Sequence, residues 1–336
     1  MRPRPARSLL ALALVACGGG QAALPGTESA AGTGPSDASS PANADRGAEA
    51  SGIGSEADSA LAGAQGKTES FSDASSLAAL KPRLTKDSLE GVARLDLAGR
   101  SFGAGLGKLL AGSNALSGLA ALDVSDNELG ADGVRALAKS SGLGGLHQLE
   151  IAGNEMGDPG ASALAGATGW KQLKVLNLSG NSIGPNGAKA LAASPLLTSV
   201  VSLDLSMNPI GFDGARALAS SSNLGELRSL FLLGSEIGPE GAKALAGSTR
   251  LRSLAVLALS GNGIGDSGAA SLAGADSLAS VKTLDLSANG IGDSGAKALA
   301  ASSRLGGVRS LEMFGNDFGA AGRDALKKRF GSALKL

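Results

Sequence analysis

The sequence is poor in the residues that carry most protein chemistry. It contains one cysteine, one histidine and no tyrosine, and aromatic residues make up 2% of its 336 residues. A single cysteine forms no intramolecular disulfide, and one cysteine with one histidine supplies too few ligands for zinc. The formal net charge is zero, whereas a general nucleic-acid binder shows a basic face. We therefore expect no metal site, no cofactor, no nucleic-acid partner and a core of aliphatic side chains.

What the sequence has instead is a pattern that returns at a constant interval. Its clearest copy is LNLSGNSIGPNGAKAL, Leu176 to Leu191, with Asn181 as a marker. Adding 27 to the number of one marker gives the number of the next, and this produces nine copies without an insertion. The marker positions are Arg100, Asn127, Asn154, Asn181, Asn208, Ser235, Asn262, Asn289 and Asn316.

Each copy combines a strand with a helix. Leu176 and Leu178 alternate with polar residues, as in a strand, whereas Ala188 and Leu191 are three residues apart, as on one helix face. Acidic residues near the helix start suggest side-chain caps at Asp158, Asp266 and Asp293. Neighbouring strands lie about 4.8 Å apart and helices about 8 to 10 Å apart, so a stack of copies must curve with its strands on the concave side.

The marker and the leucines before it resemble a known family. Leu173, Leu176, Leu178 and Asn181 read L-x-x-L-x-L-x-x-N, the signature of a leucine-rich repeat. The following Gly-Ala-Lys-Ala-Leu-Ala run resembles the ribonuclease-inhibitor-like class of that repeat. The resemblance implies an α/β solenoid, a horseshoe of nine strand-helix repeats with a parallel sheet on its concave face, which we assign to residues 83–336.

The amino terminus differs from the repeats. Three arginines precede the apolar run Leu9 to Val15, and Leu14-Val15-Ala16-Cys17 follows. This resembles a bacterial lipoprotein signal, residues 1–17, and implies acylation of Cys17 and attachment to a membrane, with the outer membrane as the expected location. The alternative is an ordinary signal peptide with an incidental cysteine. Residues 18–82, rich in Ala, Gly, Ser and Pro, are expected to form a disordered tether.

Two short motifs look like catalytic signatures. GDSGA occurs at Gly265 to Ala269 and again in the next copy, and resembles the nucleophile segment of trypsin-like proteases. The only histidine, His147, is four repeats from Ser267, about 20 Å at one strand per repeat, which is too far for a proton relay. The segment from Gly103 to Lys108 lacks the Ser or Thr of a phosphate-binding loop. We read both as repeat turns and predict that the protein is not an enzyme.

The residue between the two strand leucines should point out of the concave face, and two groups stand out at or near this position. Asp96, Asp123 and Glu150 place adjacent acids at the amino end, predicted to bind a divalent cation weakly or a cationic partner segment. In the sixth copy, large apolar residues replace small and polar ones and predict an exposed interaction patch. The patch residues are Phe231 and Leu233, with Val201 and Val256 nearby. A solvated surface and sequence drift in one repeat are the plainer interpretations.

These observations favour a monomeric, lipid-anchored envelope protein that binds a protein or peptide through its concave face. In this reading the lipid alone contacts the membrane. A structural spacer or adhesin is a second hypothesis, because a repeat array needs no ligand in order to fold. A regulator of the GTPase-activator type is a third, since such activators include ribonuclease-inhibitor-like repeats, although no activating residue is identified here. The fold gives the shape, and function must be argued from the site.

Overall fold

The computed structural model describes residues 66–336, and within them a single sheet runs through every repeat. The sheet has eleven parallel strands in the order of the sequence. The strands are β1 Lys67–Ser70, β2 Val92–Asp96, β3 Ala121–Asp123, β4 Gln148–Glu150, β5 Val175–Asn177, β6 Ser202–Asp204, β7 Ser229–Phe231, β8 Val256–Ala258, β9 Thr283–Asp285, β10 Ser310–Glu312 and β11 Leu334–Lys335.

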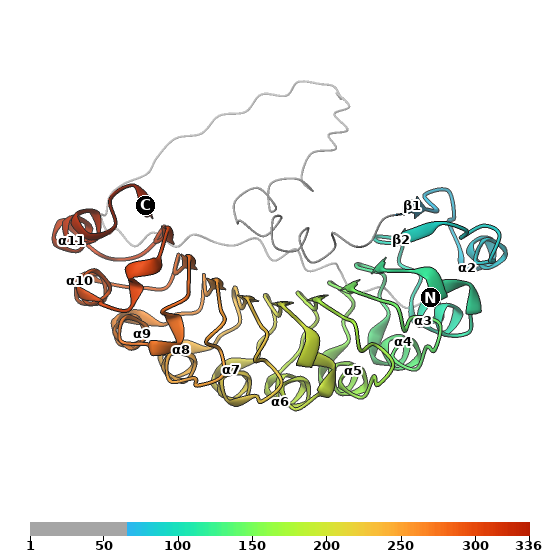
Figure 1. Ribbon diagram of the computed structural model, residues 1–336, viewed down its shortest axis with the longest axis horizontal. Helices are drawn as coiled ribbons and strands as arrows, with labels where there is room; N and C mark the ends of the chain where they lie inside the picture. The colour runs from blue at the N-terminus through green and yellow to red at the C-terminus, as the bar shows by residue number, and fades with distance from the viewer. Residues whose placement is uncertain (1–65) are drawn as a thin grey trace, which may run out of the picture. The chain divides into compact units, whose positions relative to one another are not determined.

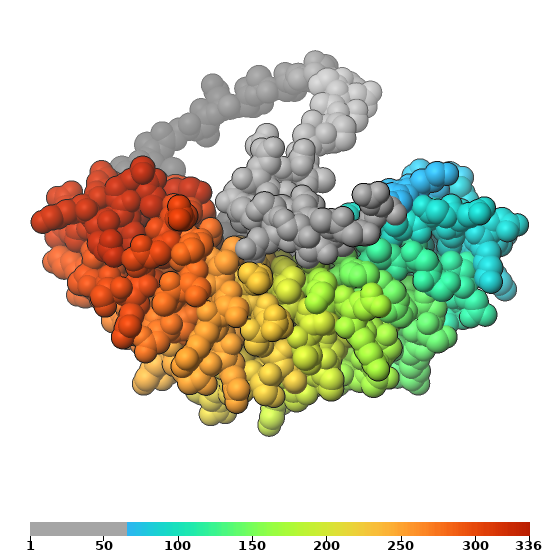
Figure 2. All heavy atoms as spheres, in the orientation of Figure 1, coloured from blue at the N-terminus to red at the C-terminus, as the bar shows by residue number. Residues whose placement is uncertain are grey.

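Helices connect the strands and line the outer side of the arc, with the strands on the inner side (Figure 1). They are α2 Leu77–Leu80, α3 Ala104–Ala111, α4 Gly130–Leu137, α5 Gly157–Ala165, α6 Pro185–Ala192, α7 Gly211–Ser220, α8 Gly238–Ala246, α9 Gly265–Ala273, α10 Asp293–Ala301 and α11 Ala320–Phe330. Figure 2 shows the sequence colours following one another along the arc without mixing, because each repeat packs on its neighbours in sequence. The predicted α/β solenoid with strands on the concave side is confirmed.

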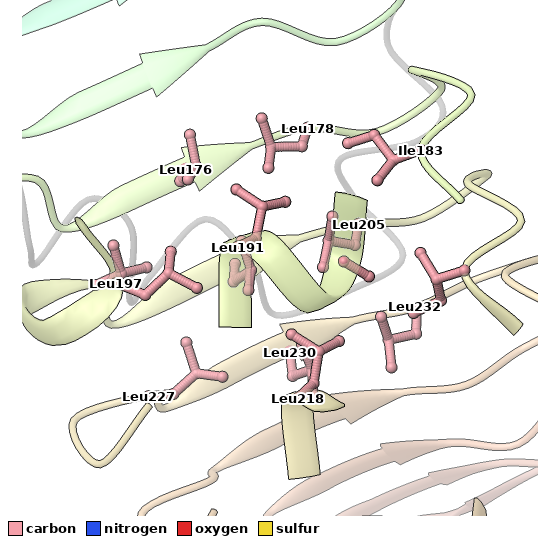
Figure 3. Close-up of a cluster of buried hydrophobic side chains, with 14 of the residues drawn as sticks. Leu176, Leu178, Ile183, Leu191, Leu197, Leu205, Leu218, Leu227, Leu230 and Leu232 are labelled. Carbon is pink, nitrogen blue, oxygen red and sulfur yellow. The ribbon is translucent and has the colours of Figure 1, made fainter. Parts of the chain in front are cut away.

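The strands pair without any change of register through the nine copies. Leu176 of β5 pairs with Leu149 on one side and Leu203 on the other, which are its equivalents in the two adjacent repeats. Because successive side chains of a strand point to opposite faces of the sheet, these leucines point toward the helices. Figure 3 shows Leu176, Leu178 and Leu191 packed between strand and helix, and all three are 1% exposed or less. The apolar columns of the sequence therefore form one continuous core.

The marker asparagines join successive repeats. The Oδ1 atom of Asn208 accepts hydrogen bonds from the backbone N–H groups of Asn181 and Ile183, both at 2.9 Å. Its Nδ2 atom donates to the carbonyl oxygen of Leu178 at 2.9 Å and to two carbonyl groups of its own turn. One buried amide thus satisfies backbone groups of two repeats, which would be costly to leave unpaired.

Ser235 interrupts this series. Its hydroxyl donates to the carbonyl oxygens of Leu205 and Leu233 at 3.3 and 3.4 Å. Within the described residues this hydroxyl accepts no hydrogen bond from the preceding repeat, although the Ser235 carbonyl oxygen accepts one from the N–H group of Gly211. The N–H group of Ile210 donates to the carbonyl oxygen of Asn208 instead. A serine side chain is too short to replace the asparagine amide at this position.

The ends of the array differ from the sequence prediction. Residues 67–83, of which 67–82 were assigned to the tether, form β1, α2 and a short 3-10 helix, and β1 pairs with β2, so the array begins before residue 83. Phe71 and Leu80 are buried there and cover the first repeat. At the other end β11 pairs with β10, and Phe330 of α11 packs against the core. These two added strands explain why nine sequence copies give eleven strands.

The predicted helix caps are also corrected. Asp158 lies inside α5, whose N-cap residue, Met156, makes no side-chain cap. The Asp158 carboxylate instead accepts hydrogen bonds from the start of α6, in the next repeat. Asp266 and Asp293 make the same contacts to α10 and α11. The caps are real, but each one stabilises the helix that follows, because the stacked turns bring that helix start within reach.

Candidate concave binding face

The strand register lines up one outward-facing residue from each of nine strands. Each member pairs with the next across the sheet, so neighbours lie about 4.8 Å apart. We call these residues the concave row: Asp96, Asp123, Glu150, Asn177, Asp204, Phe231, Ala258, Asp285 and Glu312. The structure therefore brings together Asp96, Asp123 and Glu150, as the sequence predicts, on β2, β3 and β4.

Most acids of the concave row turn back on their own backbone. Asp123 accepts a hydrogen bond from the N–H group of Ser125 at 2.9 Å, and Asp204 accepts one from Ser206 at 2.8 Å. Glu150 differs, because it accepts from Nε2 of Gln148 at 2.8 Å. The Oε1 atom of Gln148 is buried and has no hydrogen-bond partner within the described residues.

Burial makes these carboxylates harder to ionise. It raises the pKa of Asp123, and the nearby charges of Asp96 and Asp126 raise it further, against the opposing effect of the hydrogen bond from Ser125. Burial likewise raises the pKa of Glu150, and burial raises the pKa of Asp204. Within residues 66–336 none of the three forms an ion pair. The row thus contains desolvated carboxylates without a cationic partner.

Charge is distributed unevenly around the row. Beyond the ends of β3 and β4 the exposed side chains are acidic, namely Asp126, Glu128 and Glu155. Apart from Arg94, which is exposed on β2 two residues before Asp96, the basic side chains of this face lie at the beginnings of the later strands, at Lys174, Arg228, Lys282 and Arg309. The face is therefore acidic along the strand ends from β2 to β6 and basic along the strand starts from β5 to β10.

Four residues of the sixth and seventh copies form an apolar cluster that is separate from the main core. Phe231 packs with Val256 and Ala258, and Leu233 packs against them. The prediction of an exposed patch is wrong for two of these residues, because Phe231 is 3% exposed and Val256 is 7% exposed. Val201 is not part of the cluster; it lies half-buried in the column that elsewhere holds Lys174 and Arg228.

Met207 lies at the surface next to Leu233 and Gly234, beside this cluster, and sequence reasoning missed it. Its side chain is 64% exposed, its N–H group donates to the carbonyl oxygen of Leu233, and its sulfur lies beside Gly234. Met207 has a φ of 57°, and glycine occupies the equivalent position at 180, 234 and 261. A methionine in a glycine column is the signal that could have revealed it. Met207, Phe231, Leu233, Val256 and Ala258 are called the apolar patch below.

The remaining sequence predictions are located as follows. In the part of the chain that the structure describes, no cluster of three or more His, Cys, Asp or Glu residues could hold a metal ion. In the same part, no helix is long and apolar enough to span a bilayer. Ser267 lies in helix α9, and His147 precedes β4 with its ring Nδ1 atom 2.9 Å from the carbonyl oxygen of Gly145. Cys17 and the signal segment lie outside the described residues.

The model of a family described as Leucine Rich repeat matches the chain in six segments. The matched residues are 119–138, 146–165, 172–192, 197–219, 250–273 and 277–300. Each of the six segments includes one of the strands β3 to β6, β8 or β9 and most or all of the helix that follows it. No curated protein matches the sequence.

Similar folds occur among solved structures. A chain of the Rad7 and Elc1 complex from yeast aligns with a TM-score of 0.53 at 16% identity, over 76% of this chain and 65% of that one. The mouse RP105/MD-1 complex aligns with a TM-score of 0.46 at 19% identity, over 80% and 48%. The ectodomain of the Arabidopsis receptor kinase HAESA, with a peptide hormone ligand, gives 0.41 at 19%, over 73% and 37%. The chain therefore spans less than two thirds of the length of these three structures.

Proposed function

Because the repeats of this chain are leucine-rich repeats stacked into a solenoid, we propose that it binds a protein or peptide through its concave face. The observation that carries the proposal is the composition of the concave row. A spacer needs no particular residues on this face, whereas this row combines unpaired, partly desolvated carboxylates with one apolar patch at its centre. Desolvated carboxylates and exposed apolar side chains lower the stability of the free protein. A partner with complementary charges and apolar groups compensates for this loss when it binds.

The outer surface offers a useful contrast. Two grooves there, of about 800 and 450 Å³, lie between α6, α7 and α8 and are lined mainly by short polar, alanine and charged side chains. Phe212 is the one large apolar residue of the smaller groove, and the Arg216 guanidinium lies over its ring, 5.0 Å from the centroid. The charged residues of these grooves are largely paired with each other, as Arg216 is with Asp213 and Lys243 is with Glu240. The unpaired acids and the apolar cluster lie on the concave side, so we place the partner there.

We also propose that Cys17 carries a lipid and holds the array at a cell envelope, in the outer membrane. Support comes from the resemblance of Leu14-Val15-Ala16-Cys17 to a lipoprotein signal and from the absence of any other cysteine in the chain. Replacing Cys17 with Ser should move the protein from the detergent phase to the aqueous phase in a Triton X-114 partition. A Cys17→Ser variant that still enters the detergent phase contradicts the anchor.

The binding proposal is tested by photo-crosslinking in the source cells. A benzophenone amino acid is placed at Leu233 or Thr283 on the concave side and, as matched controls, at Arg216 or Lys243 on the outer helices. We expect one protein or peptide to be crosslinked from both concave positions and from neither control. Equal crosslinking from both sides, or crosslinking from the outer side alone, would overturn the proposal.

A further inference from the structure

The apolar patch is asymmetric in its exposure. Phe231, Val256 and Ala258 form a buried floor, whereas Met207 is 64% exposed and Leu233 is half-buried at the edge where β6 and β7 end. A non-glycine residue is disfavoured in the left-handed region, and the Met207 side chain is not part of the main core. A flexible, polarizable thioether adapts to different apolar partners. Met207 and Leu233 are therefore the accessible and adaptable part of the apolar patch, and Phe231, Val256 and Ala258 are its buried part.

The charges beside this patch have one sign on the amino-terminal side. Phe231 pairs directly with Asp204 on β6, and Glu150 and Asp123 follow on β4 and β3. The nearest bases, Lys174 and Arg228, lie at the beginnings of their strands, away from the strand ends where Met207 and Leu233 lie. A segment lying across the strand ends from β7 toward β2 therefore meets an apolar patch first and carboxylates afterwards.

We infer that the partner of the concave face is an extended segment with an aliphatic or aromatic anchor on the apolar patch and lysine or arginine residues facing Asp204, Glu150 and Asp123. This inference rests on the proposed function and specifies the partner's chemistry. The spacing follows from the register: Glu150 is three strands and Asp123 four strands from Phe231, or about 14 and 19 Å. At about 3.3 Å per extended residue, the basic residues lie about four to six positions from the anchor.

One further feature of the same surface fits a cationic segment. The three carboxylates with raised pKa values, Asp123, Glu150 and Asp204, form no ion pair within the described residues. An ammonium or guanidinium group beside them would favour their charged form and would supply hydrogen-bond donors to their oxygens.

The test uses the full chain and fluorescein-labelled peptides of twelve residues, read by fluorescence anisotropy at low and at physiological salt. One peptide has a Leu-Phe pair with two lysines four and six positions away. It is made in two versions, with the lysines on the carboxyl-terminal or on the amino-terminal side of the pair. Matched peptides carry glutamate in place of lysine, or serine in place of the Leu-Phe pair. The protein variants are Met207→Gly with Leu233→Ser, which restores the neighbouring repeats' residues, and Asp123→Asn with Glu150→Gln. Phe212→Ala removes an exposed aromatic residue of helix α7 as the control.

We expect the lysine peptide to bind in one of the two directions and both matched peptides to bind at least about tenfold more weakly. Each double variant should weaken the lysine peptide by about tenfold, and the acid variant should also reduce the salt dependence. Phe212→Ala should change nothing, and circular dichroism should show that every variant is folded. Equal binding of lysine and glutamate peptides, or no binding of the lysine peptide in either direction, overturns the inference. If crosslinking still identifies a concave partner, the proposed function stands and only the partner chemistry is wrong.

Discussion

The Asp158 carboxylate caps helix α6 of the next repeat: its Oδ1 atom accepts a hydrogen bond from the N–H group of the N-cap residue Gly184, 26 residues later, at 2.7 Å. The same oxygen accepts a second one from Gly187 at 2.8 Å. A Cβ atom on Gly187 would lie 2.6 Å from this oxygen, so the capped turn requires glycine there. Because the cap and the helix belong to different repeats, this contact stabilises the stack rather than a single unit.

Removing this cap should destabilise the array. Asp158→Ala leaves two N–H groups at the start of α6 without their acceptor and should lower the free energy of unfolding by about 1 kcal/mol. Asp158→Asn keeps an acceptor oxygen and should recover part of the loss. The matched control is Asp132→Ala in α4, since Asp132 is exposed and pairs with Arg135 of its own helix; its effect should stay within about 0.5 kcal/mol. Urea unfolding followed by circular dichroism measures all three.

Completing the asparagine series should stabilise the protein. Ser235→Asn places an amide where the chain now has a hydroxyl with two long hydrogen bonds. Its oxygen gives the N–H group of Asn208 an acceptor and offers another to Ile210, whose N–H group now donates to the carbonyl oxygen of Asn208. The expected gain is about 1 kcal/mol, from a buried backbone group that becomes paired, or a rise in Tm of about 2 °C. The reverse change, Asn181→Ser, should lower Tm by a similar amount or more. An unchanged or lower Tm for Ser235→Asn would show that the sixth repeat has adapted to serine.

The concave carboxylates predict a specific dependence of stability on pH. Because burial raises the pKa of Asp123 in the folded protein, this carboxyl favours the folded state when protonated, and that contribution is lost as pH rises through the folded pKa. Asp123→Asn cannot ionise and should raise Tm at pH 7, with the gain disappearing toward pH 3, below the ordinary aspartate pKa of about 3.9. Asparagine keeps the turn, as Asn177 does by accepting from the N–H group of Ser179 at 2.9 Å.

The reciprocal variant provides the control for this pH effect. Asn177→Asp puts a carboxylate between Glu150 and Asp204 in the concave row, where like charges repel. It should lower Tm at pH 7, and the loss should become smaller as the pH falls. Scanning calorimetry at several pH values distinguishes this from a pH-independent packing defect, which would shift Tm equally throughout.

Much of the fold could be predicted from the sequence because one constant interval sets both the strand register and the core. Leu176 and Leu178 identify a strand, and the same positions in every other repeat follow by counting. The strand β1 was missed because Lys67-Thr-Glu-Ser70 has no alternating apolar residues, and its pairing with β2 alone makes it a strand. The target of the Asp158 cap could not be read from a local helix pattern either, since the capped N–H groups lie in the next repeat.

The candidate site was only partly predictable for a similar reason. The pairing register of β2, β3 and β4 places Asp96, Asp123 and Glu150 side by side, as predicted. Alternation also placed Phe231 on the concave side, but it does not show how far a ring packs against its neighbours, and Phe231 is buried with Val256. The exposed fraction of each side chain therefore had to come from the structure, which shows that Met207 and Leu233 are the accessible residues of the patch.

The most direct test of the account compares two faces of the same molecule. The partner identified by crosslinking is titrated by biolayer interferometry against Met207→Gly with Leu233→Ser on the concave side, and against Phe212→Ala with Arg216→Ala on the outer helices. We expect the concave variant to raise Kd by about tenfold or more and the outer variant to leave it within about twofold. An outer variant that weakens binding as much, or a concave variant that binds like the parent, would contradict binding through the concave face.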